Sequence, residues 1–407
     1  MNRLFFPLKN RISPNHFLLN IGYQTPVSRS NNIILYGKRL FLPIIIMVLF
    51  LSSQILLAQS LDIPSKDWGL SIGNSKKFSG VRLNFRDHNV QQINGLNITL
   101  WAAKYNEKAI VNGISLGVLP EAGYLKGIQI GLAGVGAESD LKGISLGLIG
   151  AGSGKNVSGV AIGGLGVGSG GDVSGLMLGG LGAGAGGSIK GIAIGGLGTG
   201  AGGDITGIGC GLLGVGSGGN VKGILIGGLG AGVSGNLTGF TLGLLGTGAG
   251  ENITGVTIGG IGAGAGENIT GITVGGIGAG AGENVTGIAI GGIGAGAGVE
   301  LRGITVGGLG AGAPSVKGLT LSLGTARGQK VQGVTVAGLW FKVNDDGLMK
   351  GLSISAFNQI KGVQNGVSFG IFNWAWHLNG VQLGLINYVR DNPKFLKILP
   401  VINVHFD

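Results

Sequence analysis

The stretch that decides the fold runs from Glu251 to Gly266 and reads ENITGVTIGGIGAGAG. Two near copies follow directly and end at Gly298. Further out, a glycine recurs every 16 residues from Gly127 to Gly303 without one slip, and looser copies of the pattern continue on both sides. Nearly the whole chain is therefore one array, and a unit of 16 residues is its structural element.

Composition narrows the type of secondary structure. Of the 407 residues, 92 are Gly and only 11% are charged, whereas 44% are hydrophobic. Collagen is excluded because there is no Gly-X-Y triplet, and disorder is disfavoured because the chain has ample aliphatic side chains to bury. Helix fails because each interior Gly costs about 0.8–1.0 kcal/mol relative to Ala and every regular unit carries five to seven. The β-branched residues and regular turns instead predict short strands.

The spacing of apolar residues within one unit predicts the path of the chain. Six apolar side chains are expected to face the interior: Ile253, Val256, Ile258, Ile261, Ala263 and Ala265. Their spacing departs twice from the alternation of a straight strand, and glycines stand at those places. Corners are therefore expected at Thr254-Gly255, Gly259-Gly260 and Gly266-Glu267-Asn268. The fold class predicted is all-β, a three-sided tandem-repeat β-solenoid of about 17 coils, on the order of 80 Å long.

A polar residue recurs at one turn of each unit, and it is nearly always Asn or Asp. Short polar side chains at this position can bond the local backbone, and stacked Asn side chains can form a ladder along the coils. The predicted structural turn ladder consists of Asn156, Asp172, Asp204, Asn220, Asn236, Asn252, Asn268 and Asn284.

Shifts in composition divide the chain into five parts. Residues 1–37 are expected to be a disordered leader or to reflect a mis-assigned start, and residues 38–58 a signal peptide. Residues 59–122 are expected to form irregular N-terminal repeats or a cap, and residues 123–314 the regular array. Only Phe240 is aromatic between Leu125 and Leu339, whereas residues 315–407 hold ten aromatic side chains, which predicts irregular repeats ending in an aromatic-rich C-terminal cap.

The export signal is predicted from charge and hydropathy. Lys38-Arg39 precede an apolar run from Leu40 to Leu57, and Ala58 then offers a small-residue cleavage site. We expect cleavage after Ala58, although the apolar run is also long enough for a membrane anchor. No Cys stands at the cleavage point, so lipidation is not expected, and the protein is placed at the cell surface, outer membrane or periplasm.

No residues with a catalytic, cofactor-binding or metal-binding pattern emerge, and no enzymatic activity is expected. Gly-x-Gly-x-x-Gly recurs in successive units where no helix is available, so it does not indicate a dinucleotide site. The four His pair with no Cys or acid at ligand spacing. Cys210 occupies the position of Ile258, and we expect a buried, inert thiol there. The basic residues are scattered, so no nucleic-acid partner is expected.

The C-terminal part resembles a known family. Asn379–Tyr388 (NGVQLGLINY), the shorter Asn365–Asn373 (NGVSFGIFN) and the ending from Asn392-Pro393 to Phe406 are similar to the bacterial outer-surface repeat proteins of spirochaetes and Bacteroidetes-type genomes. The similarity is best from about Gly318 onward. It implies an exported, repeat-bearing protein of the outer surface, and it implies no particular enzymatic activity.

Three functions are compatible with these patterns. The first is a non-enzymatic rod at the cell surface or outer membrane that acts as a structural spacer or an adhesion-type contact surface, with an unidentified surface or protein partner. The second is a porin-like transmembrane β-barrel, because units of 16 residues could supply strand-plus-turn elements. The third is an ice- or polymer-binding solenoid, for which Thr241, Thr257, Thr273 and Thr305 would form a partial outward ladder.

Overall fold

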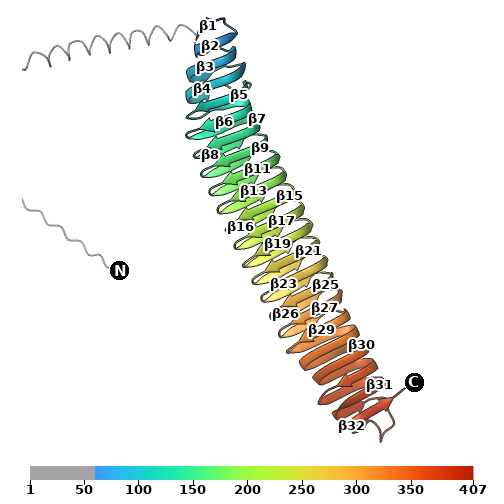
Figure 1. The fold of residues 1–407 in the computed structure, drawn as a ribbon. Coiled ribbons are helices and arrows are strands. Elements are labelled where there is room, and N and C mark those ends of the chain that lie inside the picture. The colour runs from blue at the N-terminus through green and yellow to red at the C-terminus, as the bar shows by residue number, and fades with distance from the viewer. Residues whose placement is uncertain (1–59, 407) are drawn as a thin grey trace, which may run out of the picture. The chain divides into compact units, whose positions relative to one another are not determined.

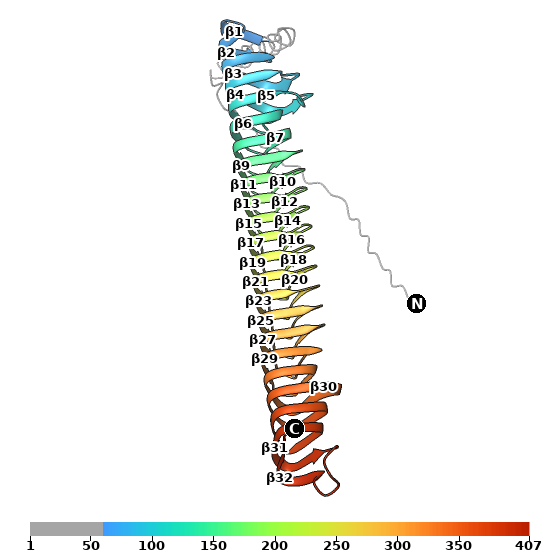
Figure 2. The same ribbon diagram turned by 90° about the vertical axis from the view of Figure 1, so that its right-hand side faces the viewer.

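The protein's computed structural model describes residues 60–406, which form one β-solenoid. Its coils stack into a rod, with β1 (Ser60–Pro64) at one end and β32 (Ile398–His405) at the other (Figures 1 and 2). This part of the chain contains strands, turns and bends but no helix. The predicted all-β solenoid with a 16-residue repeat is therefore confirmed. The expected leader and signal peptide lie outside the described residues.

A regular coil consists of a long strand and a short one, as in β21 (Ile253–Gly259) and β22 (Gly262–Ala265). The chain bends at residues 260–261 and 266–267, which coincide with two of the three expected corners. The third expected corner falls at Gly255, inside the continuous strand β21.

In the regular coils each strand pairs in parallel, and in register, with the strand one coil away. Gly255, for example, stands opposite Gly239 in one neighbour and Gly271 in the other. The alternative of a transmembrane barrel is wrong, because such barrels are built from antiparallel neighbours.

The strand boundaries follow the repeat. The first coils contain β2 (Trp68–Gly73), β3 (Lys77–His88), β4 (Gln92–Lys104), β5 (Ile110–Gly117), β6 (Glu121–Gly131) and β7 (Gly134–Gly147). The other long strands are β9 (Asn156–Gly163), β11 (Val173–Gly179), β13 (Ile189–Gly195), β15 (Ile205–Gly211), β17 (Val221–Gly227), β19 (Leu237–Gly243), β23 (Ile269–Gly275), β25 (Asn284–Gly291), β27 (Glu300–Gly307) and β29 (Ser315–Ser322). The other short strands are β8 (Gly150–Ser153), β10 (Gly166–Ser169), β12 (Gly182–Ala185), β14 (Gly198–Ala201), β16 (Gly214–Ser217), β18 (Gly230–Val233), β20 (Gly246–Ala249), β24 (Gly278–Ala281), β26 (Gly294–Ala297) and β28 (Gly310–Gly312). The last coils contain β30 (Thr325–Phe369) and β31 (Phe372–Val389).

Antiparallel strands close both ends of the rod. β1 pairs antiparallel with β2, and β32 pairs antiparallel with β31. In the coils of β30 and β31, Phe357 lies between Trp340 and Phe372, with ring centroids 5.9 and 5.0 Å apart. These closures cover the edge strands that a parallel stack would otherwise leave open to further pairing.

One column of glycines, which we call the column glycines, runs the length of the rod. It extends from Gly69 to Gly380 and, within residues 60–406, contains every glycine with positive φ except Gly73. At Gly255 φ is +131°, and a Cβ atom would lie 2.1 Å from the carbonyl oxygen of Gly239 in the preceding coil. Only glycine fits such a position, which explains why the repeat has no slip. The column contains 21 glycines, so at about 4.8 Å per coil the rod is roughly 100 Å long, longer than the expected 80 Å because it has more coils than the 17 expected.

The interior is narrower than the sequence suggested. Ile253, Ala263 and Ala265 are buried as expected. The prediction was wrong for Val256, Ile258 and Ile261, which point outward: the first two are half-buried and the side chain of Ile261 is 48% exposed. Side-chain alternation continues through the positive-φ Gly255, so residues 256 and 258 fall on the outer side of the strand and the residue between them on the inner side.

Candidate functional site: an exposed aliphatic face

The predicted turn residues stand one above another along the rod. Four side-chain hydrogen bonds of 2.8–3.1 Å link consecutive asparagines. Where the residue is Asp, its carboxylate accepts the backbone N–H of the next coil, as from Ser188 to Asp172 at 2.8 Å. The Asn156 side chain accepts the N–H of Asp172 in the same way, at 3.0 Å. All eight predicted residues thus take part in coil-to-coil bonding: Asn156, Asp172, Asp204, Asn220, Asn236, Asn252, Asn268 and Asn284.

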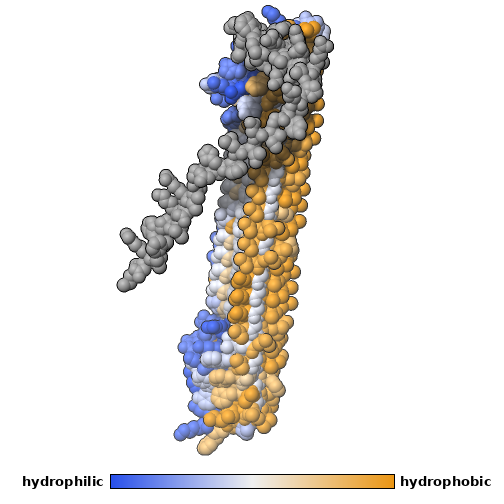
Figure 3. Space-filling view, turned by 90° about the vertical axis from the view of Figure 1, so that its left-hand side faces the viewer, coloured by the Kyte–Doolittle hydropathy of each residue, from blue (hydrophilic) through white to orange (hydrophobic). Residues whose placement is uncertain are grey.

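Most of the outer surface of the long strands is apolar, and it is this surface that the sequence analysis assigned to the interior. We define the aliphatic face as the side chains one, three and six places after each column glycine. From Ile144 to Leu309 every one of them is aliphatic except Phe240 and Cys210. The side chains of Ile272 and Ile277 are 38% and 49% exposed. Figure 3 shows the face as a hydrophobic band along the rod.

The interior position between the first two columns of this face carries polar side chains in many coils. Two residues after the column glycine stand Ser145, Thr257 and Gln382, all fully or almost fully buried. The hydroxyls of Thr241, Thr257 and Thr273 have no hydrogen-bond partner. The long strand therefore turns its aliphatic side chains outward while tolerating polar ones inside, the reverse of the usual pattern.

The buried threonines correct the expected outward ladder for ice or polymer binding. Thr241, Thr257 and Thr273 are fully buried, and Thr305 is 3% exposed. A surface ladder on these residues is therefore wrong, because they lie on the inner side of the long strand.

The expected burial of the Cys210 thiol is also wrong. It lies three places after Gly207, on the aliphatic face, and its thiol is free and half-buried rather than enclosed. Its in-register neighbours are Ile194 and Ile226. Desolvation by these surroundings raises the pKa of the thiol. Chemically it is an apolar member of the face.

The aliphatic face is larger than a protein normally exposes to water. Its columns are separated by two residues or one corner, so over the eleven coils from Ile144 to Leu309 it is about 15 Å wide and roughly 50 Å long, or on the order of 800 Å². The largest apolar patch of a typical monomer is only about 300–600 Å². At its C-terminal end the face leads into an apolar hollow of about 560 Å³ lined by Ile354, Phe369, Ile371 and Leu385.

The two edges of the aliphatic face differ in charge. One place before the column glycines runs a row of exposed residues that we call the basic row. Its charged members are all cationic: Lys126, Lys142, Lys190, Lys222, Arg302, Lys317 and Lys350. The other edge is a strip of outward glycines such as Gly262 and Gly264. Carboxylates such as Glu267 lie beyond that strip, at the turn that ends the coil.

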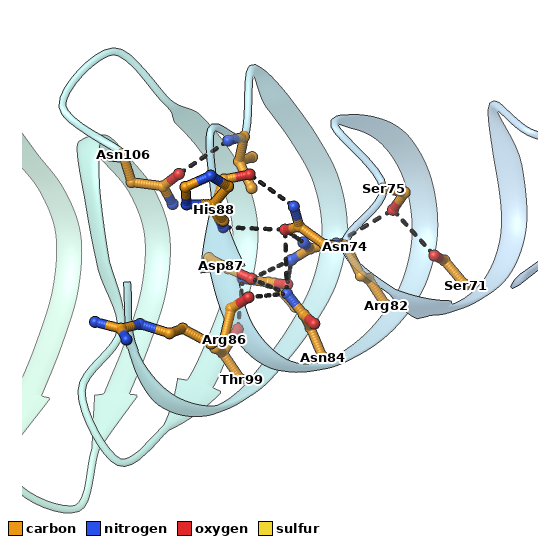
Figure 4. A network of polar contacts seen from close by, with 12 residues as sticks. Ser71, Asn74, Ser75, Arg82, Asn84, Arg86, Asp87, His88, Thr99 and Asn106 are labelled. Atoms are coloured by element: carbon orange, nitrogen blue, oxygen red, sulfur yellow. Dashed lines mark hydrogen bonds and ion pairs between the residues drawn. The ribbon is translucent and has the colours of Figure 1, made fainter. Parts of the chain in front are cut away.

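A buried polar cluster fills the interior near the N-terminal end (Figure 4). Arg82 is fully buried and donates to Asp87 at 2.5 Å, to Asn97 at 2.8 Å and to Asn74 at 3.0 Å. Asn97 in turn donates to the second oxygen of Asp87 at 3.0 Å. Every charged atom has a partner within the cluster, so the arrangement suits internal packing of the first coils.

Residues 60–406 contain no group of three His, Cys, Asp or Glu side chains suited to a metal ion. In the same part of the chain no helix could span a membrane. No protein-family description, curated protein or solved structure matches the chain.

Proposed function

We propose that this protein is an exported structural rod of the cell surface or outer membrane, where it acts as a spacer or adhesion-type contact surface through its aliphatic face. The observation that carries the proposal is the outward display of apolar side chains in every coil from Ile144 to Leu309. An apolar surface of this size needs a partner, because leaving it in water is unfavourable by about 25 cal/mol per Å².

The repetition itself supports a structural role. The column glycines, the turn ladder and the aliphatic face recur in nearly every coil. A spacer or a contact surface uses every coil in the same way. A catalytic site would instead require one coil to differ from its neighbours. The signal-like segment before Ser60 and the resemblance of the C-terminal repeats to outer-surface proteins supply the expected location.

Cell fractionation tests the proposal. The protein is expressed with its own N-terminal segment in a Gram-negative host, beside a face variant carrying Ile208→Thr, Ile224→Thr and Ile272→Thr. These changes keep β-branched side chains on the strands and remove apolar surface. The wild type is expected in the envelope fraction, and the face variant is expected to shift toward the released fraction with an unchanged circular dichroism spectrum. Retention of the wild type in the cytoplasm, or equal envelope binding by both proteins, would refute the proposal.

A further inference from the structure

We infer that the partner of the aliphatic face is a lipid leaflet containing anionic headgroups, along which the rod lies lengthwise. This inference rests on the proposed function, since it names the chemistry that the same face contacts. It is drawn from the flatness of the face, its freedom from charge and the position of the basic row.

The face is straight and free of charge. Neighbouring coils pair in register, so Ile208, Ile224 and Phe240 stand directly opposite one another in successive strands. No ionisable side chain except the Cys210 thiol occurs on the face between Ile144 and Leu309. A protein partner would need a matching apolar surface of comparable length, whereas a leaflet accepts apolar side chains over any length.

The basic row lies where headgroup phosphates would be. It borders the first column of the aliphatic face along the rod and contains no acidic residue. Lys190 and Lys222 are exposed and form no ion pair within the described residues. Aliphatic side chains inserted at the hydrocarbon boundary, with lysines at its edge, are the pattern of interfacial membrane binding.

Charge placement disfavours a second copy of the chain on this face. Around each coil the order is the position of the basic row, the aliphatic face, the glycine strip and the closing turn, which carries Glu251, Glu267 and Glu283 in three coils. In an antiparallel face-to-face pair the two basic rows would lie along the same edge and repel each other. In a parallel pair each basic row would face the glycine strip of the other copy, which offers no carboxylate. Neither arrangement neutralises the lysines, whereas anionic headgroups do.

Vesicle flotation tests the inference with the exported protein. The vesicles are made of phosphatidylcholine alone or of phosphatidylcholine with phosphatidylglycerol. The wild type is expected to float with both, and more strongly with phosphatidylglycerol at low salt, since salt screens the lysine contribution. All variants are exported and processed in the same way, so any contribution of the N-terminal segment is the same for each protein compared.

Matched lysine variants locate the charged contact. Lys222→Gln removes a cation from the basic row, and Lys155→Gln removes one from the turn beyond the glycine strip. Lys222→Gln should weaken binding to phosphatidylglycerol vesicles about fivefold and leave binding to phosphatidylcholine unchanged, while Lys155→Gln should change neither. Equal effects of the two substitutions would show dependence on net charge alone and would overturn the assigned orientation.

The single cysteine reports which partner covers the face. Cys210 is labelled with a polarity-sensitive fluorophore, and vesicles carrying nitroxide-labelled acyl chains are added. Strong quenching is expected, because only lipid brings the nitroxide to the face. A protein that does not float and sediments as a concentration-dependent dimer would overturn the lipid partner while keeping the proposed contact surface. A monomer that binds no vesicle would overturn both.

Discussion

Two glycines of one coil provide the sharpest test of the stacking. Gly223, a column glycine in β17, has φ of +142°, and a Cβ atom would lie 2.0 Å from the carbonyl oxygen of Gly207. Gly232, in β18, would place a Cβ atom with nothing within 4 Å. The substitutions Gly223→Ala and Gly232→Ala therefore add the same methyl group to the same coil in opposite environments.

The expected effects differ in sign. For Gly223→Ala the left-handed backbone costs about 1–2 kcal/mol, and displacing the facing carbonyl breaks a coil-to-coil hydrogen bond of about 1 kcal/mol, so the free energy of unfolding should fall by about 3 kcal/mol. For Gly232→Ala it should rise by about 0.4–1 kcal/mol, because the unfolded chain loses freedom.

Guanidinium unfolding followed by circular dichroism measures this difference. Hydrogen exchange of the β17 amides localises it, because unfolding of a solenoid can spread from coil to coil. Equal midpoints for the two variants, or a larger loss for Gly232→Ala, would refute the column-glycine explanation of the repeat.

Other predictions concern interior and surface polar groups. Thr257→Val should raise the free energy of unfolding by about 1–3 kcal/mol, because it removes a buried hydroxyl with no partner. Thr199→Val should lower it, because that hydroxyl bonds the backbone of Cys210. Arg82→Met should cost about 3–5 kcal/mol by leaving Asp87 buried and unpaired, and adding Asp87→Asn should recover part of the loss. Denaturant unfolding compares Thr257→Val with Thr199→Val, and Arg82→Met with the double variant. A lysine hydrogen bond lowers the pKa of Glu300 below 4.5, so its contribution is present above pH 4.5 and is lost as the pH falls through the lower folded pKa. The Glu300→Gln variant should lack this acid-dependent loss, which is less than about 1 kcal/mol and is measurable by thermal melts at successive pH values.

The period and the bends could be predicted from the sequence because glycine has few substitutes. Only glycine can adopt the positive φ of Gly255 and also leave room for the carbonyl oxygen of Gly239 in the preceding coil. Its recurrence every 16 residues therefore predicts both the stack and its registration. The polar turn residues recur at the same interval, and Asn236, Asn252 and Asn268 are bonded along the rod.

The direction of the side chains was not predictable from hydropathy, and the outward aliphatic face was missed for that reason. The side chains of Val256, Thr257 and Ile258 point alternately outward and inward, as expected for a strand. Because apolar side chains are usually buried, the two aliphatic ones were assigned to the interior, which is the wrong side of the strand. A signal for the true phase exists in side-chain size. Gly209 occupies an interior position whose space is filled by Leu225 of the next coil and by Val215. Such compensation between neighbouring coils indicates packing against one another rather than against a partner.

Antiparallel strands close the rod at β1 and β32, and the coils between them are uniform. The number of coils could therefore change between generations without altering either end. Recombination between two copies of the repeat would add or delete whole sets of 16 codons and would leave the two terminal structures intact. Each addition would extend the rod by about 4.8 Å and bring one more strip of exposed aliphatic surface. The length of the rod and the area of its aliphatic face would therefore increase together, by one coil at a time.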